Sequence, residues 1–400
     1  MRILFITDNF PPEVNAPATR TYEHCREWVK SGTEVTVITG APNYPQGKLY
    51  KGYKNKLYQS EVVDGIKVIR VWTYIAPNAG ILKRTFDFIS FSISSFFVGL
   101  FVKTDIIIAT SPQLFSAVAG MLIGFFKRKP WIMEVRDLWP ESIITLGAMK
   151  SGFAIRVFEW LENKLYRSAE RIVVVTDSFK VRIVEKGINP EKIFVHKNGA
   201  NIEKFKAQPK NQKLLDKLGL NGQNVVGYIG THGLAHNLDF ILKAISENHE
   251  KDIKFLFIGD GAVKKDIVAL AEDLELKNVI FHPPVSKEEI KEYLSIIDVS
   301  LVPLIRTDTF KTVIPSKIFE AAAMQKPVLL GVEGESKELI EKYHAGLAFI
   351  PDDANDFKDK LNQIIRNLFQ FEQGLEKLAV DFDRKKIAAS MLRTIQLSIK

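Results

Sequence analysis

The residues of this chain best suited to chemistry form one short run, Pro315-Ser-Lys-Ile-Phe-Glu320. Pro315 is expected to end a loop and Ser316 to cap a helix, because Lys317 to Met324 are mostly good helix formers. The first turn of a helix offers free backbone N–H groups and a positive dipole end, which favour a phosphate. Lys317 adds a mobile positive charge, and Glu320 can accept hydrogen bonds from a ribose diol. Diphosphate and ribose together indicate a nucleotide.

The same run has a plainer interpretation, as a capping sequence on a helix that packs against a sheet. The elements around it bear on the choice. The segment Gln325-Lys-Pro327 is expected to end the helix, and Val328-Leu-Leu330 to form a short buried strand. A helix followed by a buried strand is one repeat of an α/β domain, which is where phosphate sites of this kind occur.

The first half of the chain repeats this alternation. Its opening strand-loop-helix-strand unit is Rossmann-like, but its loop lacks G-x-G-x-x-G, so NAD and FAD are not expected. Ligands of such sheets bind beyond the carboxyl ends of the strands, which places Asn15, Arg20 and the cluster Arg136-Asp-Leu-Trp-Pro-Glu141 near a cleft. The expected strands are 2–7, 34–39, 67–71, 105–109, 131–135 and 171–176, with a helix at 19–30.

The second half restarts the pattern after a polar linker at 203–212. The strand at 224–229 ends in Gly230-Thr-His-Gly233, and the strand at 254–258 ends in Gly259-Asp-Gly261. A third strand, 298–303, leads toward Pro315. A length of 400 residues exceeds what one hydrophobic core usually serves, so we predict two α/β domains, 1–202 and 203–381, followed by a basic helix at 382–400.

Composition bounds the class of protein. Apolar content of 46% and charged content of 26% are typical of a globular chain. The net charge of +8 is concentrated in the first 200 residues, which carry +9, whereas the last 200 carry −1. This asymmetry predicts an anionic partner for the first half, either a membrane surface or a phosphorylated substrate. No basic run alternates with aromatic residues, so nucleic acid is not expected.

The sequence also bears on location. Cys25, the single cysteine, lies in an apolar helical stripe and is expected to be a core residue in a reducing compartment. Residues 1–8 run into a strand without a signal-peptide layout, so we expect a cytoplasmic protein. The uncharged segment 88–102 covers 15 residues, short of the roughly 20 that span a bilayer. It is either a buried helix or a helix lying in the membrane interface.

Over essentially its whole length the chain resembles the bacterial retaining glycosyltransferases of the GT-B architecture, in family four. Each motif is weak alone, but their order and spacing together are specific. Within this family the chain is most similar to the O-antigen and capsule branch that includes N-acetyl-L-fucosaminyl transferases. The residues that carry the resemblance are Phe10-Pro-Pro-Glu13, Arg136-Asp-Leu-Trp-Pro-Glu141, Lys197-Asn-Gly199, Gly230-Thr-His-Gly233, Gly259-Asp-Gly261, Asp298, Pro303 and Pro315-Ser-Lys-Ile-Phe-Glu320.

The resemblance implies an α/β fold of two Rossmann-like domains facing across a cleft, with a C-terminal helix crossing back to the first domain. The second domain would bind the nucleotide-sugar and the first the acceptor. Lys317, Arg136 and Asp137 would carry the reaction, and Asn15, Arg20 and Glu141 would lie on the acceptor side. The implied donor-binding residues are Gly230, Thr231, His232, Gly233, Gly259, Asp260, Gly261, Ser316, Lys317, Ile318 and Glu320.

The implied reaction moves a sugar, such as N-acetyl-L-fucosamine, from a UDP-sugar to a polyprenyl-diphosphate-linked saccharide, with retention at the anomeric carbon. It would take place at the inner face of the cytoplasmic membrane, in O-antigen or capsular polysaccharide synthesis. No cofactor is expected beyond the donor. No metal is expected either, since the sequence shows no Asp-x-Asp pair or histidine cluster where a metal-bound diphosphate would lie.

Two departures from the family pattern leave alternatives open. Thr312 stands where the family commonly has a second glutamate, and Thr231, His232 and His236 stand where an arginine and a lysine are common. Lys317 could replace the lost positive charge. The alternatives are a nucleotide-sugar epimerase of the same fold and a non-catalytic nucleotide-sugar-binding subunit of a polysaccharide assembly complex.

Overall fold

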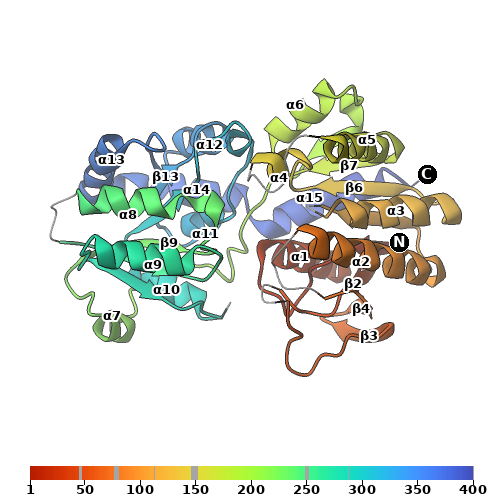
Figure 1. The fold of residues 1–400 in the computed structure, drawn as a ribbon, viewed down its shortest axis with the longest axis horizontal. Coiled ribbons are helices and arrows are strands. Elements are labelled where there is room, and N and C mark those ends of the chain that lie inside the picture. Colours follow the sequence, from red (N-terminus) through yellow and green to blue (C-terminus); the bar gives the residue numbers. More distant parts are fainter. Residues whose placement is uncertain are drawn as a thin grey trace. The chain divides into compact units, whose positions relative to one another are not determined.

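The structure is a computed structural model that describes residues 1–44, 47–75, 81–111, 113–145, 152–247, 252–286 and 288–399 (Figure 1). The chain divides into two compact units. Unit 1 comprises Met1–Lys197 and Arg384–Lys400, and unit 2 comprises Asn198–Asp383. The predicted domains end at 202 and 381, whereas the chain passes between the units after 197 and after 383. Both units are α/β, and both have a central sheet of mainly parallel strands.

Unit 1 has an eight-stranded sheet in the order β3-β4-β2-β1-β5-β6-β7-β8. Neighbouring strands run parallel except β3, which pairs antiparallel with β4. Helices cover a parallel sheet on both faces, so its central strands are continuous apolar runs; every residue of β5 is buried. The strands are β1 (Arg2–Ile6), β2 (Glu34–Thr39), β3 (Tyr58–Val63), β4 (Ile66–Val71), β5 (Ile106–Thr110), β6 (Trp131–Val135), β7 (Arg171–Val174) and β8 (Ile193–Val195).

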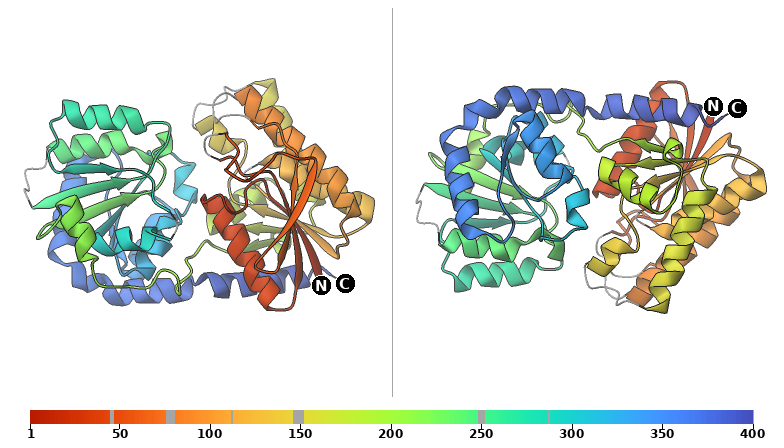
Figure 2. Two further views of the ribbon diagram at one scale, coloured as in Figure 1. Left: turned by 90° about the horizontal axis from the view of Figure 1, so that it is seen from below. Right: turned by 90° about the horizontal axis from the view of Figure 1, so that it is seen from above.

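The helices of unit 1 form two groups, one in which α3 packs on α2 and α5, and one in which α1 packs on α15 (Figure 2). Helix α1 begins earlier than the predicted residue 19, because the side chain of Asn15 accepts a hydrogen bond from Ala18 N at 2.8 Å and caps it. The helices are α1 (Ala16–Lys30), α2 (Ile81–Phe101), α3 (Leu114–Lys127), α4 (Glu141–Thr145), α5 (Phe153–Ser168), α6 (Asp177–Glu185), the 3₁₀ turn η1 (Pro190–Lys192) and α15 (Arg384–Gln396).

The C-terminal helix α15 is an integral part of unit 1. Trp28 of α1 donates a hydrogen bond from its indole nitrogen to the carbonyl oxygen of Ala388 at 2.8 Å. Met391 and Ile395 of α15 belong to the same buried cluster as Trp28 and Cys25. Cys25 is therefore a core residue, as predicted. The last helix completes the core on one face of the sheet of unit 1.

Unit 2 has a six-stranded parallel sheet in the order β11-β10-β9-β12-β13-β14, with one continuous apolar core. Its strands are β9 (Asn224–Ile229), β10 (Ile253–Ile258), β11 (Val279–His282), β12 (Val299–Pro303), β13 (Val328–Gly331) and β14 (Gly346–Ala348). Its helices are α7 (Gln212–Leu218), α8 (Leu238–Ser246), α9 (Lys264–Asp273), α10 (Ile290–Ile296), α11 (Lys317–Ala323), α12 (Glu335–Tyr343), α13 (Ala354–Arg366) and α14 (Glu372–Asp381), with 3₁₀ turns η2 (Leu234–His236), η3 (Phe310–Thr312) and η4 (Leu368–Phe371).

The uncharged segment 88–102 falls on helix α2. One side of this helix is buried, as Phe91 and Ser95 are fully covered, whereas Phe97 and Phe101 are 59% and 87% exposed. The segment is therefore a helix with one buried side and one exposed side. Among the described residues, the structure holds no helix whose length and apolar character would let it cross a bilayer.

Candidate functional site

The predicted donor-binding motifs of unit 2 meet at the carboxyl edge of its sheet. The loop 230–233 follows β9 and the loop 259–261 follows β10. Helix α11 follows β12 after a connecting segment. Strand β9 lies between β10 and β12, so the chain order of the sheet reverses there. Crevices beyond the strand ends at such reversal points are where open α/β sheets bind ligands.

The two glycine loops lock against each other. Gly230 N donates to Ile258 O at 2.9 Å, and His232 N donates to Asp260 O at 2.9 Å. Gly259 has a φ of +142°, and a Cβ there would stand 1.9 Å from Gly230 O. A side chain at Gly259 would therefore collide with the neighbouring loop. Gly259 is therefore needed for the packing of the two loops. A close approach of the donor's nucleotide base to the backbone of 259–261 remains a prediction.

Lys317 lies across Gly230. A Cβ on Gly230 would stand 2.6 Å from Lys317 Cε, so the glycine makes room for the lysine side chain. Lys317 Nζ sits 3.7 Å from the centre of the Tyr228 ring, where a cation is attracted to the aromatic face. Burial lowers the pKa of Lys317 from 10.5 to about 7, with the charge of Glu320 acting in the opposite direction.

Lys317 is one of a cluster of four basic side chains, which also includes His232, His236 and Lys264. His232 is fully buried, and both of its ring nitrogens lack a hydrogen-bond partner among the described residues. His236 Nδ1 and Lys264 Nζ are also buried and have no hydrogen-bond partner among the residues that the structure describes. Buried polar atoms are normally paired, so this cluster fits a ligand that brings acceptor oxygens.

The pKa values in the cluster are lowered first by burial and, for the two histidines, also by the neighbouring lysines. Burial, together with nearby Lys264 and Lys317, lowers the pKa of His232 to about 4. Burial and then Lys317 lower the pKa of His236 to about 3. Burial also lowers the pKa of Lys264, whereas Asp260 favours its charged form. A diphosphate would supply the missing negative charge, so the electrostatics fit such a group.

Lys264 is a site residue that the sequence reasoning missed. It follows Gly259-Asp-Gly261 closely, and Nζ lies 4.7 Å from the centre of the Phe281 ring. The family commonly has an arginine and a lysine after the first strand of the second domain, and there this chain has Thr231, His232 and His236. A lysine just beyond the second glycine loop was the available signal, but its place beside His232 depends on how the two loops pack.

The start of helix α11 differs from the prediction. Ser316 has helical backbone angles and its side chain caps nothing, so the predicted serine cap is wrong. Helix α11 has seven residues, and Ile318 N and Phe319 N donate to Pro315 O and Ser316 O at 3.2 Å and 3.1 Å. Ile318 itself is fully buried. The basic side chains, more than free helix N–H groups, therefore make this region suitable for an anion.

The remaining predicted donor residues surround the cluster. Thr231 and Asp260 are exposed, and Glu320 is half-buried one turn beyond Lys317. The hydroxyl of Thr312, at the place of the second family glutamate, donates to the carbonyl oxygen of Thr309 at 2.7 Å. Thr312 thus closes its own 3₁₀ turn. The ribose role of Glu320 remains a prediction.

Arg136 and Asp137 lie just beyond β6, at the carboxyl edge of the sheet of unit 1. Arg136 N donates to Ser111 Oγ at 2.9 Å, whereas its guanidinium Nε and Nη1 are buried without a partner among the described residues. Burial lowers the pKa of Arg136 to about 10 and raises that of Asp137 to about 6. Shifted pKa values are common where residues meet a substrate, and the catalytic roles of Arg136 and Asp137 remain predictions.

The predicted acceptor-side residues have intramolecular partners. Arg20 is 1% exposed, pairs with Glu134 at 2.9 Å and donates to the carbonyl oxygens of residues 196 and 197. Its guanidinium is enclosed, so we assign it a structural role in place of the predicted contact with an acceptor. Asn15 caps α1, and Glu141 lies 3.5 Å from Lys186 Nζ.

The described residues include no group of three or more His, Cys, Asp or Glu side chains arranged to hold a metal ion. The positive charge of the cluster in unit 2 comes from Lys264 and Lys317, because the two histidines are neutral at pH 7 and offer only their ring N–H groups.

Two family models match the chain in succession. The model described as "Glycosyl transferase 4-like domain" matches residues 15–199, and "Glycosyl transferases group 1" matches residues 210–378. The chain is 25% identical to the Escherichia coli protein WcaI, a glycosyl transferase assigned to colanic acid biosynthesis, over 81% of each chain.

Solved structures share the fold. Sucrose-phosphate synthase from Thermosynechococcus elongatus aligns with a TM-score of 0.78 at 16% identity, over 99% of this chain and 98% of that chain. The Anabaena protein HepE, solved with UDP and glucose, aligns with a TM-score of 0.74 at 18% identity, over 99% of both chains. With two Rossmann-like units and family models matching both halves, the chain belongs to the GT-B glycosyltransferases of family four.

Proposed function

We propose that this protein transfers a sugar from a UDP-sugar to a lipid-linked saccharide during synthesis of a surface polysaccharide. The observation that carries the proposal is the cluster of His232, His236, Lys264 and Lys317, which holds buried nitrogens without partners at the reversal point of the sheet of unit 2. The colanic acid relative supports the polysaccharide, and HepE with UDP and glucose supports the nucleotide.

The cluster suggests how transfer would proceed. Negative charge develops on the diphosphate as the bond between the sugar and the donor phosphate breaks, and basic side chains held ready beside it stabilise that charge. In a reaction with retention, the leaving phosphate oxygen accepts the proton of the acceptor hydroxyl on the same face of the sugar. Lys317 stays protonated throughout and neutralises the diphosphate. Side-chain cations would do this without a metal ion.

The finer assignments are also part of the proposal. The sequence resemblance suggests N-acetyl-L-fucosamine or a similar N-acetylated deoxyhexosamine as the donor sugar. It suggests a polyprenyl-diphosphate-linked saccharide as the acceptor. The basic first half of the chain supports a peripheral location at the inner face of the cytoplasmic membrane, where such an acceptor is anionic.

Nucleotide binding gives the first test. Thermal unfolding would be followed with UDP, GDP and dTDP, each with and without Mg²⁺, because a ligand of the folded state raises the midpoint. We expect UDP to raise the midpoint to the same extent with and without Mg²⁺. Lys264→Met should weaken UDP binding about tenfold, the loss of one charge-assisted hydrogen bond of about 1.5 kcal/mol.

The neighbouring lysine is the matched control. Lys265 is exposed, so Lys265→Met should bind UDP like the wild type. An equal loss of UDP affinity in both variants would overturn the donor site. So would an unfolding midpoint that no nucleotide raises. With an acceptor supplied, the product should keep the anomeric configuration of the donor, and EDTA should leave the rate unchanged. Donor binding without any product across acceptors would favour a non-catalytic subunit instead.

A further inference from the structure

Helices α2 and α3 of unit 1 expose an unusual number of large apolar side chains. On α2 they recur at positions 86, 93, 97 and 101, a spacing that places them along one side of a helix. The rings of Phe96 and Phe126 lie 5.6 Å apart, so the aromatic residues of the two helices are continuous. We call the exposed set the aromatic face: Phe86, Ile93, Phe97 and Phe101 of α2, with Phe125 and Phe126 of α3.

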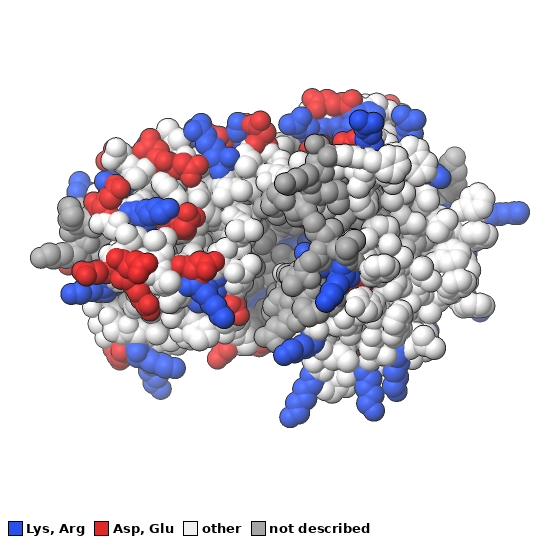
Figure 3. Space-filling model, in the orientation of Figure 1, with Lys and Arg blue, Asp and Glu red and all other residues white. Residues whose placement is uncertain are grey.

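The side chains of the aromatic face are strongly exposed. Its members are between 53% and 87% exposed, and Figure 3 shows a broad area almost free of charged side chains where Figure 1 places α2 and α3. Contiguous apolar patches of this kind mark surfaces that contact a membrane or another protein. The pocket and the charged side chains beside the aromatic face distinguish between these two kinds of partner.

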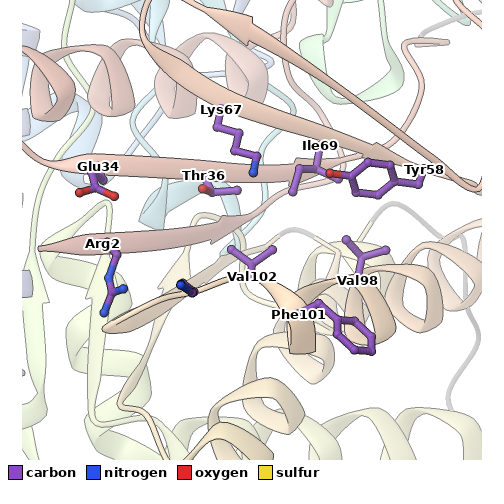
Figure 4. Close-up of a pocket in the computed structure, with 10 residues that line it drawn as sticks. Arg2, Glu34, Thr36, Tyr58, Lys67, Ile69, Val98, Phe101 and Val102 are labelled. Carbon is purple, nitrogen blue, oxygen red and sulfur yellow. The ribbon is translucent and has the colours of Figure 1, made fainter.

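A pocket of about 450 Å³ adjoins the face at the end of α2 (Figure 4). Phe101 belongs to both, Val98 precedes it on α2, and Val102 directly follows the helix. The opposite wall consists of strand residues, including Thr36, Ile69, Tyr58 and Lys67. Because Arg2 and Glu34 are the first residues of β1 and β2, the pocket lies at the amino edge of the sheet, away from Arg136 and Asp137.

Positive charge gathers at this end of the aromatic face. Lys67 and Lys103 line the pocket, and neither has an ion-pair partner in the part of the chain that the structure describes. Arg2 is paired with Asp105 at 2.7 Å, and Glu34 is the acid that lines the pocket. Lys127, at the end of α3, donates to Leu100 O at 2.7 Å and so lies beside the end of α2.

We propose that the aromatic face rests on an anionic phospholipid bilayer and that the adjoining pocket holds the phosphate of a lipid headgroup. Apolar rings enter the boundary between headgroups and acyl chains, and cations at their margin pair with lipid phosphates. A second copy of the chain fits less well, because a twofold contact through this face would bring Lys67 and Lys103 of both copies together. The inference rests on the proposed location at a membrane.

Binding to vesicles tests the inference directly. The full-length protein would be sedimented with vesicles of phosphatidylcholine alone and of phosphatidylcholine containing phosphatidylglycerol. We expect binding to the mixed vesicles that weakens as salt rises, and much weaker binding to phosphatidylcholine alone. Phe97→Ser with Phe101→Ser should abolish it, and Lys67→Glu with Lys103→Glu should weaken binding to the mixed vesicles at least about tenfold.

Matched controls lie in unit 2. Phe369, which is 83% exposed, is the aromatic control as Phe369→Ser, and the exposed Lys213 and Lys277 are the charge control as a double change to Glu. Both should bind vesicles like the wild type. Each variant would also be tested for its UDP-induced thermal shift, which separates this inference from the proposed function. The membrane contact alone would be overturned if UDP raised the unfolding midpoint of the wild type but the protein did not bind vesicles. It would also be overturned if the aromatic face proved to be covered in a dimer.

Discussion

At the scale of single residues, the protonation of Lys317 is the property that connects the structure to the proposed chemistry. The free protein holds two lysines and two histidines together with a surplus of positive potential. Burial of the side chain lowers the pKa of Lys317 to about 7, and the charge of Glu320 acts in the opposite direction. An incoming diphosphate favours the ammonium form and raises this pKa again. Binding of the donor and binding of a proton are thereby linked.

This linkage predicts a proton uptake that depends on pH. At pH 8 most free molecules have a neutral Lys317, so UDP binding should take up a proton there; at pH 6 Lys317 is already charged in both states. Calorimetry in buffers of different ionisation enthalpy measures the uptake. At pH 8 the wild type should take up as much as about one proton more per bound UDP than Lys317→Met. At pH 6 the two proteins should take up almost the same number of protons.

Two comparisons make this test specific. Lys265→Met, which removes an exposed lysine nearby, should take up as many protons as the wild type. An uptake at pH 8 that is equal in the wild type and in Lys317→Met would show that Lys317 does not meet the diphosphate. Proton uptake by His232 and His236 would occur at lower pH, since their pKa values in the free protein are about 4 and about 3.

At the scale of elements, the contact between α1 and α15 decides whether the two segments of unit 1 hold together. Besides the hydrogen bond from Trp28 to Ala388, Arg384 Nε lies 3.2 Å from Glu23 Oε2, with both side chains less than 10% exposed. Removing one partner of a buried ion pair leaves the other charge uncompensated. Loss of either side chain would therefore leave a buried charge between α1 and α15 and weaken their contact.

Arg384→Met should lower the stability of unit 1 by about 3 kcal/mol, because Glu23 would remain buried without its partner. All five tryptophans, Trp28, Trp72, Trp131, Trp139 and Trp160, belong to unit 1, so denaturant unfolding followed by their fluorescence reports on that unit. Arg393→Met, an exposed change on the same helix, is the control and should have little effect. Adding Glu23→Gln to Arg384→Met should restore part of the loss; a further decrease would argue against the pair.

At the scale of the whole molecule, the α/β class was predictable because buried parallel strands leave a strong pattern. Runs such as 106–110 and 225–229 are short and mostly apolar, and the second ends in the glycine loop at 230–233. The carboxyl ends of parallel strands share one edge, so motifs distant in the chain could be assigned to one site. The resemblance groups the loops at 230 and 259 with Lys317, and the shared edge of the parallel strands is the physical reason why they meet.

What could not be predicted depends on side-chain packing. The presence of Lys264 beside His232 follows from how two loops lock together, and no periodicity reveals that. Arg20 was assigned to a cleft by its place in the chain, but Glu134, far along the sequence, encloses it. Ser316 belongs to a residue type that often caps helices, yet the local backbone is already helical there. The exposure of Phe97 and Phe101 likewise depends on what covers α2.

The division of unit 1 into a long first segment and a short last one has a consequence for synthesis on the ribosome. Unit 2 is continuous in the chain and can complete its fold while the final helix is still within the exit tunnel. Unit 1 emerges first, yet the apolar surface around Trp28 has no cover until Met391 and Ile395 have been released. Unit 1 thus begins to emerge before unit 2 but completes its core after it. Until then its exposed apolar surface can bind chaperones and neighbouring nascent chains.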